Sequence, residues 1–112
     1  MKLSPHFDLV EFTRSDTALR LGIDNTLPPQ LASKALETAH MMERVRAYLC
    51  DLARKEVPIE VTSGYRCAAL NTAVGGAAQS DHMRMMAVDF RAPVFGTPLQ
   101  ICQAMAPAVE SV

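Results

Sequence analysis

The chain has 112 residues, 49% of them hydrophobic, and its 11 basic and 12 acidic side chains leave a formal net charge of -1. This length predicts one small domain, residues 1–112, with enough apolar side chains for a single core. The balanced charge argues against a nucleic-acid partner, and the apolar runs are too short to cross a bilayer, which argues against a membrane protein. The first residues lack the apolar segment of a secretion signal, so we expect a protein that is cytoplasmic as synthesised.

The cysteines give no sign of a metal cluster. Cys50, Cys67 and Cys102 are odd in number and scattered along the chain, and no CxxC pair is present. A zinc cluster held by cysteines is therefore not expected. Reduced thiols are the default state for such residues in a cytosolic protein.

The first quarter of the chain predicts short helices. Residues 6–16 read as one short helix, and Asp16 can cap a second one that stops at Gly22. Asn25 or Thr26 can cap a third helix, because the prolines that follow are tolerated in a first turn.

Apolar residues then recur at steps of three and four, as they do on one face of an amphipathic helix. The stripe consists of Leu31, Ala35, Thr38, Met42, Val45, Leu49 and Leu52. Charged residues lie mostly off it. We expect this long helix to end near Lys55, because Pro58 disfavours a helical conformation at the residue before it.

The second half of the chain alternates between strands and helices. Residues 58–65 form a β-branched run that ends at a glycine turn, and residues 86–90 form a second short strand. Residues 67–74 between them predict a short helix. Residues 96–112 predict the last helix, with Thr97 as its cap. The fold class is therefore α+β.

Two short strands make a marginal sheet, and exposed strand edges invite pairing with another chain. We therefore expect an open edge after the second strand. Either two chains pair across it as a homodimer, or a further segment covers it.

Three polar clusters can meet at one end of this sheet. They are the segments TSGYR, LNTAVGG and SDHMRMMAVDF. Arg66 follows the glycine turn, and its guanidinium is suited to a carboxylate. Asp89 lies in a strand that we expect to be half buried, where a carboxylate needs an arginine or a metal as partner. Two of these residues also have an ordinary structural interpretation. Arg66 then is a solvated surface arginine, and His82 is a histidine that is only hydrogen-bonded.

These residues resemble a known family, the zinc D-alanyl-D-alanine carboxypeptidases and the related phage endolysin L-alanyl-D-glutamate peptidases. The family pattern is approximately S-G-[YF]-R-S, then L-N, then V-G-G, then S-x-H-x-x-G-x-A-x-D. The matching residues here are Ser63, Gly64, Tyr65, Arg66, Leu70, Asn71, Val74, Gly75, Gly76, Ser80, His82, Ala87 and Asp89. The opening segment, residues 3–26, also resembles the lead-in of a phage and bacterial subgroup.

The resemblance implies a role for each of four residues. His82 and Asp89 would be zinc ligands, Arg66 would hold a carboxylate or carbonyl of the substrate peptide, and Ser80 would contact the peptide backbone. It implies a zinc-dependent peptidase that acts on peptidoglycan stem peptides or cross-links, of phage, prophage or bacterial origin, which can reach the cell wall after phage-type release. The implied fold is a long helix and short helices packed on a small antiparallel sheet, as in the hedgehog signalling domain.

The chain departs from the family pattern in ways that bear on activity. The family has a third ligand, a second His, on a strand after the last helix, with a catalytic acid or base shortly before it. This chain reaches Val112 before such a strand, so we expect a domain that is C-terminally truncated, lacks the general base and holds zinc weakly or not at all. Met85 stands where the family has Gly, and Cys67 where Ser is usual. The alternative is a non-catalytic structural or peptide-binding relative.

Overall fold

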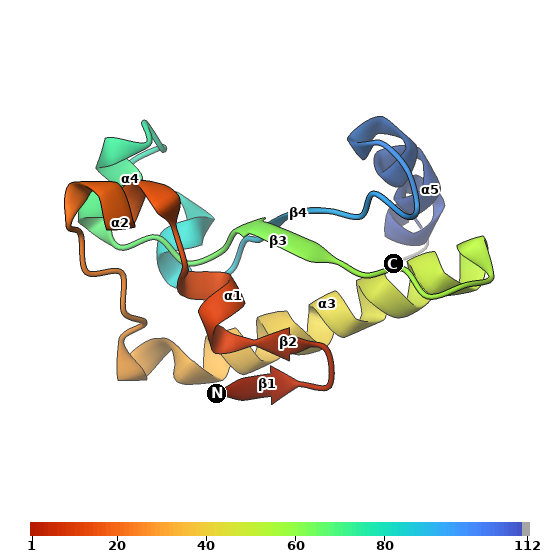
Figure 1. Ribbon diagram of the computed structural model, residues 1–112, viewed down its shortest axis with the longest axis horizontal. Coiled ribbons are helices and arrows are strands. Elements are labelled where there is room, and N and C mark those ends of the chain that lie inside the picture. The colour runs from red at the N-terminus through yellow and green to blue at the C-terminus, as the bar shows by residue number, and fades with distance from the viewer. Residues whose placement is uncertain (111–112) are drawn as a thin grey trace.

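The longest element is the helix α3, Ala32–Ala53, which runs along the base of the molecule in Figure 1. This computed structural model describes residues 1–110. The buried residues of α3 are Ala35, Thr38, Ala39, Met42 and Leu49. They belong to the predicted stripe or lie next to it, so the apolar periodicity does set the face that packs on the core. Arg54, in a left-handed conformation, ends the helix where the sequence predicts.

The N-terminus forms a small hairpin that the sequence analysis did not predict. Strand β1, Lys2–Ser4, pairs antiparallel with β2, Phe7–Asp8. The helix expected over residues 6–16 is therefore wrong in its bounds, and only α1, Leu9–Thr13, is helical there. Asp8 caps α1 in a capping box with Glu11, which explains why the helix begins where the strand ends.

Helix α2, Asp16–Leu21, ends at Gly22, whose φ of 68° is left-handed, as the sequence predicts. Its cap is Ser15, whose hydroxyl accepts a hydrogen bond from the backbone of Ala18 at 3.1 Å, and not Asp16. The expectation that Asn25 or Thr26 caps a helix is wrong. A short 3₁₀ turn η1, Pro29–Leu31, precedes α3 without a side-chain cap.

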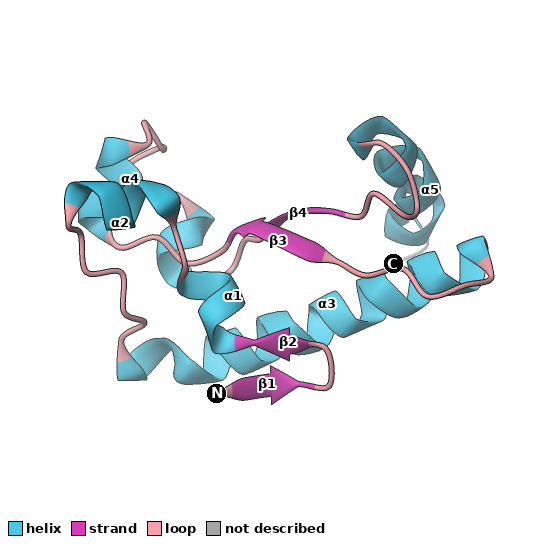
Figure 2. Ribbon diagram, viewed as in Figure 1, coloured by secondary structure: helices cyan, strands magenta, loops and turns pink. Residues whose placement is uncertain are grey.

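The second sheet carries the polar clusters. Strand β3, Glu60–Ser63, pairs antiparallel with β4, Asp89–Arg91, and places Ser63 opposite Asp89. Between the two strands lie α4, Ala68–Ala73, and the 3₁₀ turn η2, Asp81–Arg84. The last helix, α5, Pro98–Glu110, begins at Thr97, whose hydroxyl accepts from the backbone of Gln100 at 3.2 Å. Figure 2 shows two short, separate sheets in a molecule that otherwise consists of helices and loops. The α+β class is thus confirmed.

Two apolar clusters hold these elements together. The first lies between α3, the N-terminal hairpin and β3, and its buried members include Phe7, Phe12, Met42, Val61 and Met85. The second lies at the other end of α3, where Leu49, Val57, Ala92 and Ile101 anchor α5. Within residues 1–110, no helix has both the length and the apolar character needed to span a membrane.

Met85, which replaces the family's glycine, adopts a glycine-like backbone conformation. It ends η2 with φ 57° and ψ 31°, in the left-handed region. That conformation costs a side-chain-bearing residue about 1–2 kcal/mol relative to the right-handed one. The side chain is fully buried in the first apolar cluster, and the Thr38 hydroxyl donates to the Met85 carbonyl at 2.7 Å. Packing in the core therefore offsets the strain, and the methionine does not fill the polar cleft.

This conformation predicts an unusual order of stability for substitutions at Met85. Both Met85→Ala and Met85→Gly lose the buried side chain. For a Met-to-Ala change, this loss lowers the free energy of unfolding by about 2–5 kcal/mol. Only glycine also removes the left-handed strain. We expect the Met85→Gly variant to be the more stable of the two by about 1 kcal/mol, measured by urea unfolding. An alanine variant as stable as the glycine variant would contradict the assigned backbone conformation.

Candidate active site

His82 lies on η2 with both ring nitrogens facing oxygen atoms. The Ser80 hydroxyl caps the turn by accepting from the His82 backbone N–H at 3.2 Å. The ring Nδ1 is 2.7 Å from the carbonyl oxygen of Gly64, and Nε2 is 3.4 Å from Oδ2 of Asp89. Because a carbonyl oxygen only accepts, Nδ1 must carry the hydrogen in this contact. In the neutral ring, the lone pair of Nε2 therefore faces the Asp89 carboxylate.

A lone pair that faces a carboxylate oxygen is an arrangement suited to a metal ion between the two atoms. Zinc binds His nitrogen and carboxylate oxygen at about 2.0–2.2 Å in tetrahedral geometry, which puts two such ligands about 3.4 Å apart. The observed separation of Nε2 and Oδ2 is 3.4 Å. Zinc-ligating histidines also commonly donate their other N–H to a backbone carbonyl, as His82 does to Gly64. The pair thus fits two ligand positions of one zinc ion.

No third ligand joins this pair among the residues that the structure describes. Within residues 1–110, no group of three His, Cys, Asp or Glu side chains could hold a metal ion. His6 contacts Glu43 through Nδ1 at 2.7 Å, and His40 is exposed on α3. Cys67 is only partly buried. The donor set in this part of the chain is therefore one imidazole and one carboxylate.

Arg66 and Ser80 lie next to the His82–Asp89 pair. The Nη2 of Arg66 donates to the Ser80 hydroxyl at 3.4 Å, and the Arg66 backbone N–H donates to the His82 carbonyl at 3.1 Å. The Nε of Arg66 is buried and, within the described residues, has no hydrogen-bond partner. A buried donor without a partner is costly, so this guanidinium keeps one donor that the described residues do not satisfy.

The structure therefore brings together the four residues singled out from the sequence: Arg66, Ser80, His82 and Asp89. Arg66 and Asp89 line the same cleft, of about 350 Å³. Tyr65 borders this cleft as well, and burial raises the pKa of its phenol, with a smaller contribution from the charge of Cys67. The phenol is thus protonated at neutral pH.

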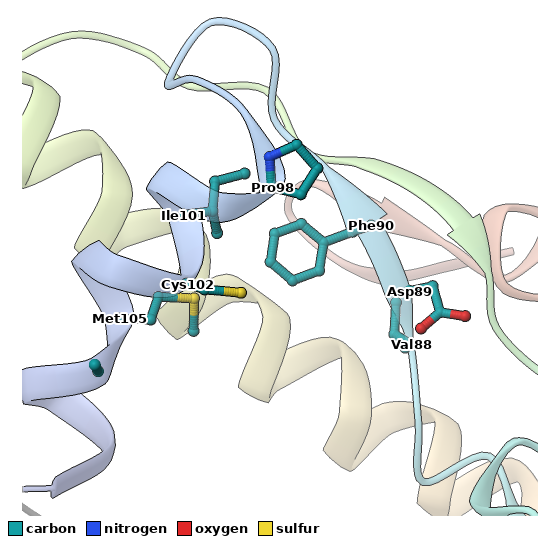
Figure 3. Close-up of a pocket in the computed structure, with 8 residues that line it drawn as sticks. Val88, Asp89, Phe90, Pro98, Ile101, Cys102 and Met105 are labelled. Atoms are coloured by element: carbon teal, nitrogen blue, oxygen red, sulfur yellow. The ribbon is translucent and has the colours of Figure 1, made fainter.

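One expectation about Asp89 is wrong. The sequence places Asp89 in a strand expected to be half buried, where a carboxylate would need a partner, but 66% of the Asp89 side chain is exposed. Among the described residues, β4 pairs with β3 alone, and the Asp89 side chain lies at the cleft. Figure 3 shows that the carboxylate points away from α5, whereas the ring of Phe90 faces that helix. The exposure leaves Asp89 accessible to a ligand and removes burial as a reason for it to need a partner.

Phe90 faces a second, apolar cleft between β4 and α5, with a volume of about 530 Å³ (Figure 3). It is lined by Val88, Asp89, Phe90, Pro98, Ile101, Cys102, Met105 and Ala106. Asp89 thus borders both clefts. The described part of the chain has no strand on this side of β4.

Two buried asparagines build the site from segments that are distant in sequence. The amide of Asn25 donates to the carbonyls of Thr13 at 2.8 Å and Tyr65 at 2.9 Å, and its oxygen accepts from the Cys67 N–H at 2.8 Å. Sequence reasoning missed this role because Asn25 reads locally as a helix cap. No local pattern marks partners 12, 40 and 42 residues away.

Asn71 explains the LN and VGG segments of the sequence pattern. Its amide donates to the carbonyl of Ala77 at 2.8 Å, which fixes the loop that leads to Ser80. A Cβ on Gly76 would lie 2.1 Å from the Asn71 side-chain oxygen. Glycine is therefore needed at Gly76 for the loop to approach the buried amide.

Comparison with known proteins places this geometry in a family. The model of the family described as Peptidase M15 matches residues 5–108. Searches of curated proteins and of solved structures gave no match. The match covers nearly the whole chain, and the residues of the cleft lie within it. Its members are metallopeptidases, typically zinc-dependent. The chain belongs to the Peptidase M15 family.

Proposed function

We propose that this domain belongs to a zinc-dependent peptidase of the D-alanyl-D-alanine carboxypeptidase or endolysin type, and that it acts on peptidoglycan stem peptides or cross-links. The observation that carries the proposal is the 3.4 Å separation of His82 Nε2 and Asp89 Oδ2, with Nδ1 tied to the Gly64 carbonyl. A bacterial or phage origin, with release to the cell wall, is consistent with such a substrate.

Each residue has a distinct task in this proposal. His82 and Asp89 would hold a zinc ion, and the Gly64 carbonyl fixes the His82 tautomer that leaves Nε2 free. When bound, zinc polarises a substrate carbonyl and activates water. Arg66 binds a carboxylate or carbonyl oxygen of the peptide through its guanidinium, while Ser80 orients the guanidinium and contacts the peptide backbone.

A second candidate function is a peptide-binding relative without catalysis. It is favoured by the absence of a third ligand among residues 1–110. Two protein ligands are fewer than the three of a catalytic zinc site, so we expect weak zinc binding by these residues alone. The open side of β4 leaves room for a second copy of the chain, or for a covering segment, to pack next to Asp89.

Zinc titration of the purified protein tests the proposed ligands. By isothermal titration calorimetry, we expect one weak zinc site whose affinity falls by about tenfold or more in His82→Ala and in Asp89→Asn, because each removes one of two ligands. His40→Ala is the matched control, since His40 is exposed on α3. A site that His82→Ala leaves unchanged would contradict the metal assignment.

The same protein separates the two candidate functions. A protein that binds a stem peptide and cleaves it when zinc is added is a peptidase. One that binds the peptide through Arg66 but binds no zinc is the non-catalytic relative. In both cases, Arg66→Gln should weaken peptide binding, which is followed by NMR chemical-shift changes.

A further inference from the structure

We infer that the turn between α1 and α2 forms the second wall of the substrate cleft, and that Arg14 in this turn binds a substrate carboxylate that Arg66 does not. The inference rests on the proposed function of the same site. It deepens that function, because it identifies a residue that selects peptides with two carboxylates.

The cleft has two walls that come from different parts of the chain. One wall consists of Thr62, Ser63, Gly64, Tyr65, Arg66, Leu70 and Val74, with Asp89 beside them. The other consists of Arg14, Ser15, Asp16 and Thr17. In Figure 1, α1 and α2 lie next to α4 and the segment that follows β3. The volume of about 350 Å³ is in the range of small-ligand sites.

Two arginines and two aspartates line this cleft, and the two guanidiniums are its groups suited to an anionic ligand. Within residues 1–110, neither the Arg14 nor the Arg66 guanidinium forms an ion pair, a state they share with three of the six other arginines. Asp16 also lines the cleft but contacts neither arginine as an ion pair. It lies in the first turn of α2, where an acidic side chain stabilises the helix dipole. Two guanidiniums in one cleft are suited to two carboxylates.

The position of Arg14 relative to Arg66 is fixed by hydrogen bonds. The Tyr65 N–H donates to the Phe12 carbonyl at 2.6 Å, and Asn25 bonds to Thr13, directly before Arg14. Asn25 also bonds to Tyr65 and Cys67, the two neighbours of Arg66. The backbones that carry the two arginines are therefore held together before a ligand binds. Such preorganisation lowers the entropy cost of binding.

Arg14 is exposed and also borders a second hollow, which is lined by the same turn and residues 23–26. Its exposure makes a substitution compatible with folding, since no side-chain hydrogen bond or ion pair of Arg14 is present in the described structure. Arg20, on the same helix pair, is exposed as well but lines neither hollow. Arg20→Gln thus removes the same charge close by and serves as the matched control.

The test uses two peptides that differ in one carboxylate, N-acetyl-L-alanyl-D-glutamate and N-acetyl-L-alanyl-D-glutamine. Affinities are measured by NMR titration of the whole chain. We expect the wild type to bind the glutamate peptide about tenfold more tightly, as a charge-assisted hydrogen bond to Arg14 would give. Arg14→Gln should remove this preference while its affinity for the glutamine peptide stays within about twofold. Arg66→Gln should weaken both peptides.

The outcomes separate this inference from the function on which it rests. Equal affinity of the wild type for the two peptides overturns the role of Arg14 and leaves the peptide site standing. The role of Arg14 is also overturned if Arg20→Gln loses as much of the preference for the glutamate peptide as Arg14→Gln does. Failure of the wild type to bind either peptide overturns the proposed function, and the role of Arg14 with it.

Discussion

Gly64→Ala is expected to destabilise the protein by about 2–4 kcal/mol, the cost of forced overpacking together with a broken hydrogen bond. A Cβ at this position would lie 2.5 Å from the carbonyl oxygen and 2.8 Å from the Cα of Phe12. Both are backbone atoms, so α1 would have to move away from the segment after β3. The hydrogen bond from Tyr65 N–H to the Phe12 carbonyl, at 2.6 Å, would break.

The same substitution should also weaken zinc binding, because the Gly64 carbonyl orients the His82 ring. Urea unfolding and zinc titration measure the two effects. Gly22→Ala is the comparison, since a Cβ there meets no atom within 4 Å and only the left-handed φ of 68° opposes it. Gly22→Ala should lower the free energy of unfolding by about 1 kcal/mol. A Gly64→Ala protein as stable as Gly22→Ala would show that the close approach to Phe12 can relax.

Much of the candidate site could be predicted from sequence because the relevant residues lie in one continuous stretch. Arg66 follows β3, Ser80 and His82 lie on one turn, and Asp89 begins the strand that pairs with β3. An antiparallel return from β3 to β4 through α4 and η2 brings such residues to the same end of a sheet. The exposure of Asp89 could not be predicted, because it depends on whether another segment packs over its face of β4, which residues 86–90 alone do not show.

The remaining errors have a common cause in long-range contacts. The hairpin of β1 and β2 has strands of three and two residues, too short for a period-2 pattern, and depends on packing against α3. The glycine position of Met85 could be identified by resemblance. A buried methionine is expected of an apolar side chain, but its packing partners on α3 and the N-terminal segment could not be read from the sequence. Asn25 is the clearest case, since all three of its partners are distant in sequence.

Asn25→Ala is expected to lower the free energy of unfolding by about 2–4 kcal/mol, because it removes three hydrogen bonds and leaves backbone groups of Thr13, Tyr65 and Cys67, buried or partly buried, without these partners. Asn25 is 8% exposed, so water replaces little of what is lost. Arg14 and Arg66 are carried by the segments that Asn25 joins. Peptide affinity should therefore fall even under conditions where the variant remains folded.

Asn25→Asp tests whether the amide acts through its donors or only through its shape. The aspartate keeps an oxygen for the Cys67 N–H, but at neutral pH its second oxygen would face the carbonyls of Thr13 and Tyr65, where the amide nitrogen lies at 2.8 Å and 2.9 Å. Burial and these two oxygens raise the pKa of such a carboxyl in the folded state above its unfolded value. The folded state then binds more protons, so stability should increase as the pH falls towards the acidic range. Urea unfolding of Asn25→Asp and wild type over the same pH series gives the difference. A difference that does not change with pH would mean that the two carbonyls do not face this side chain.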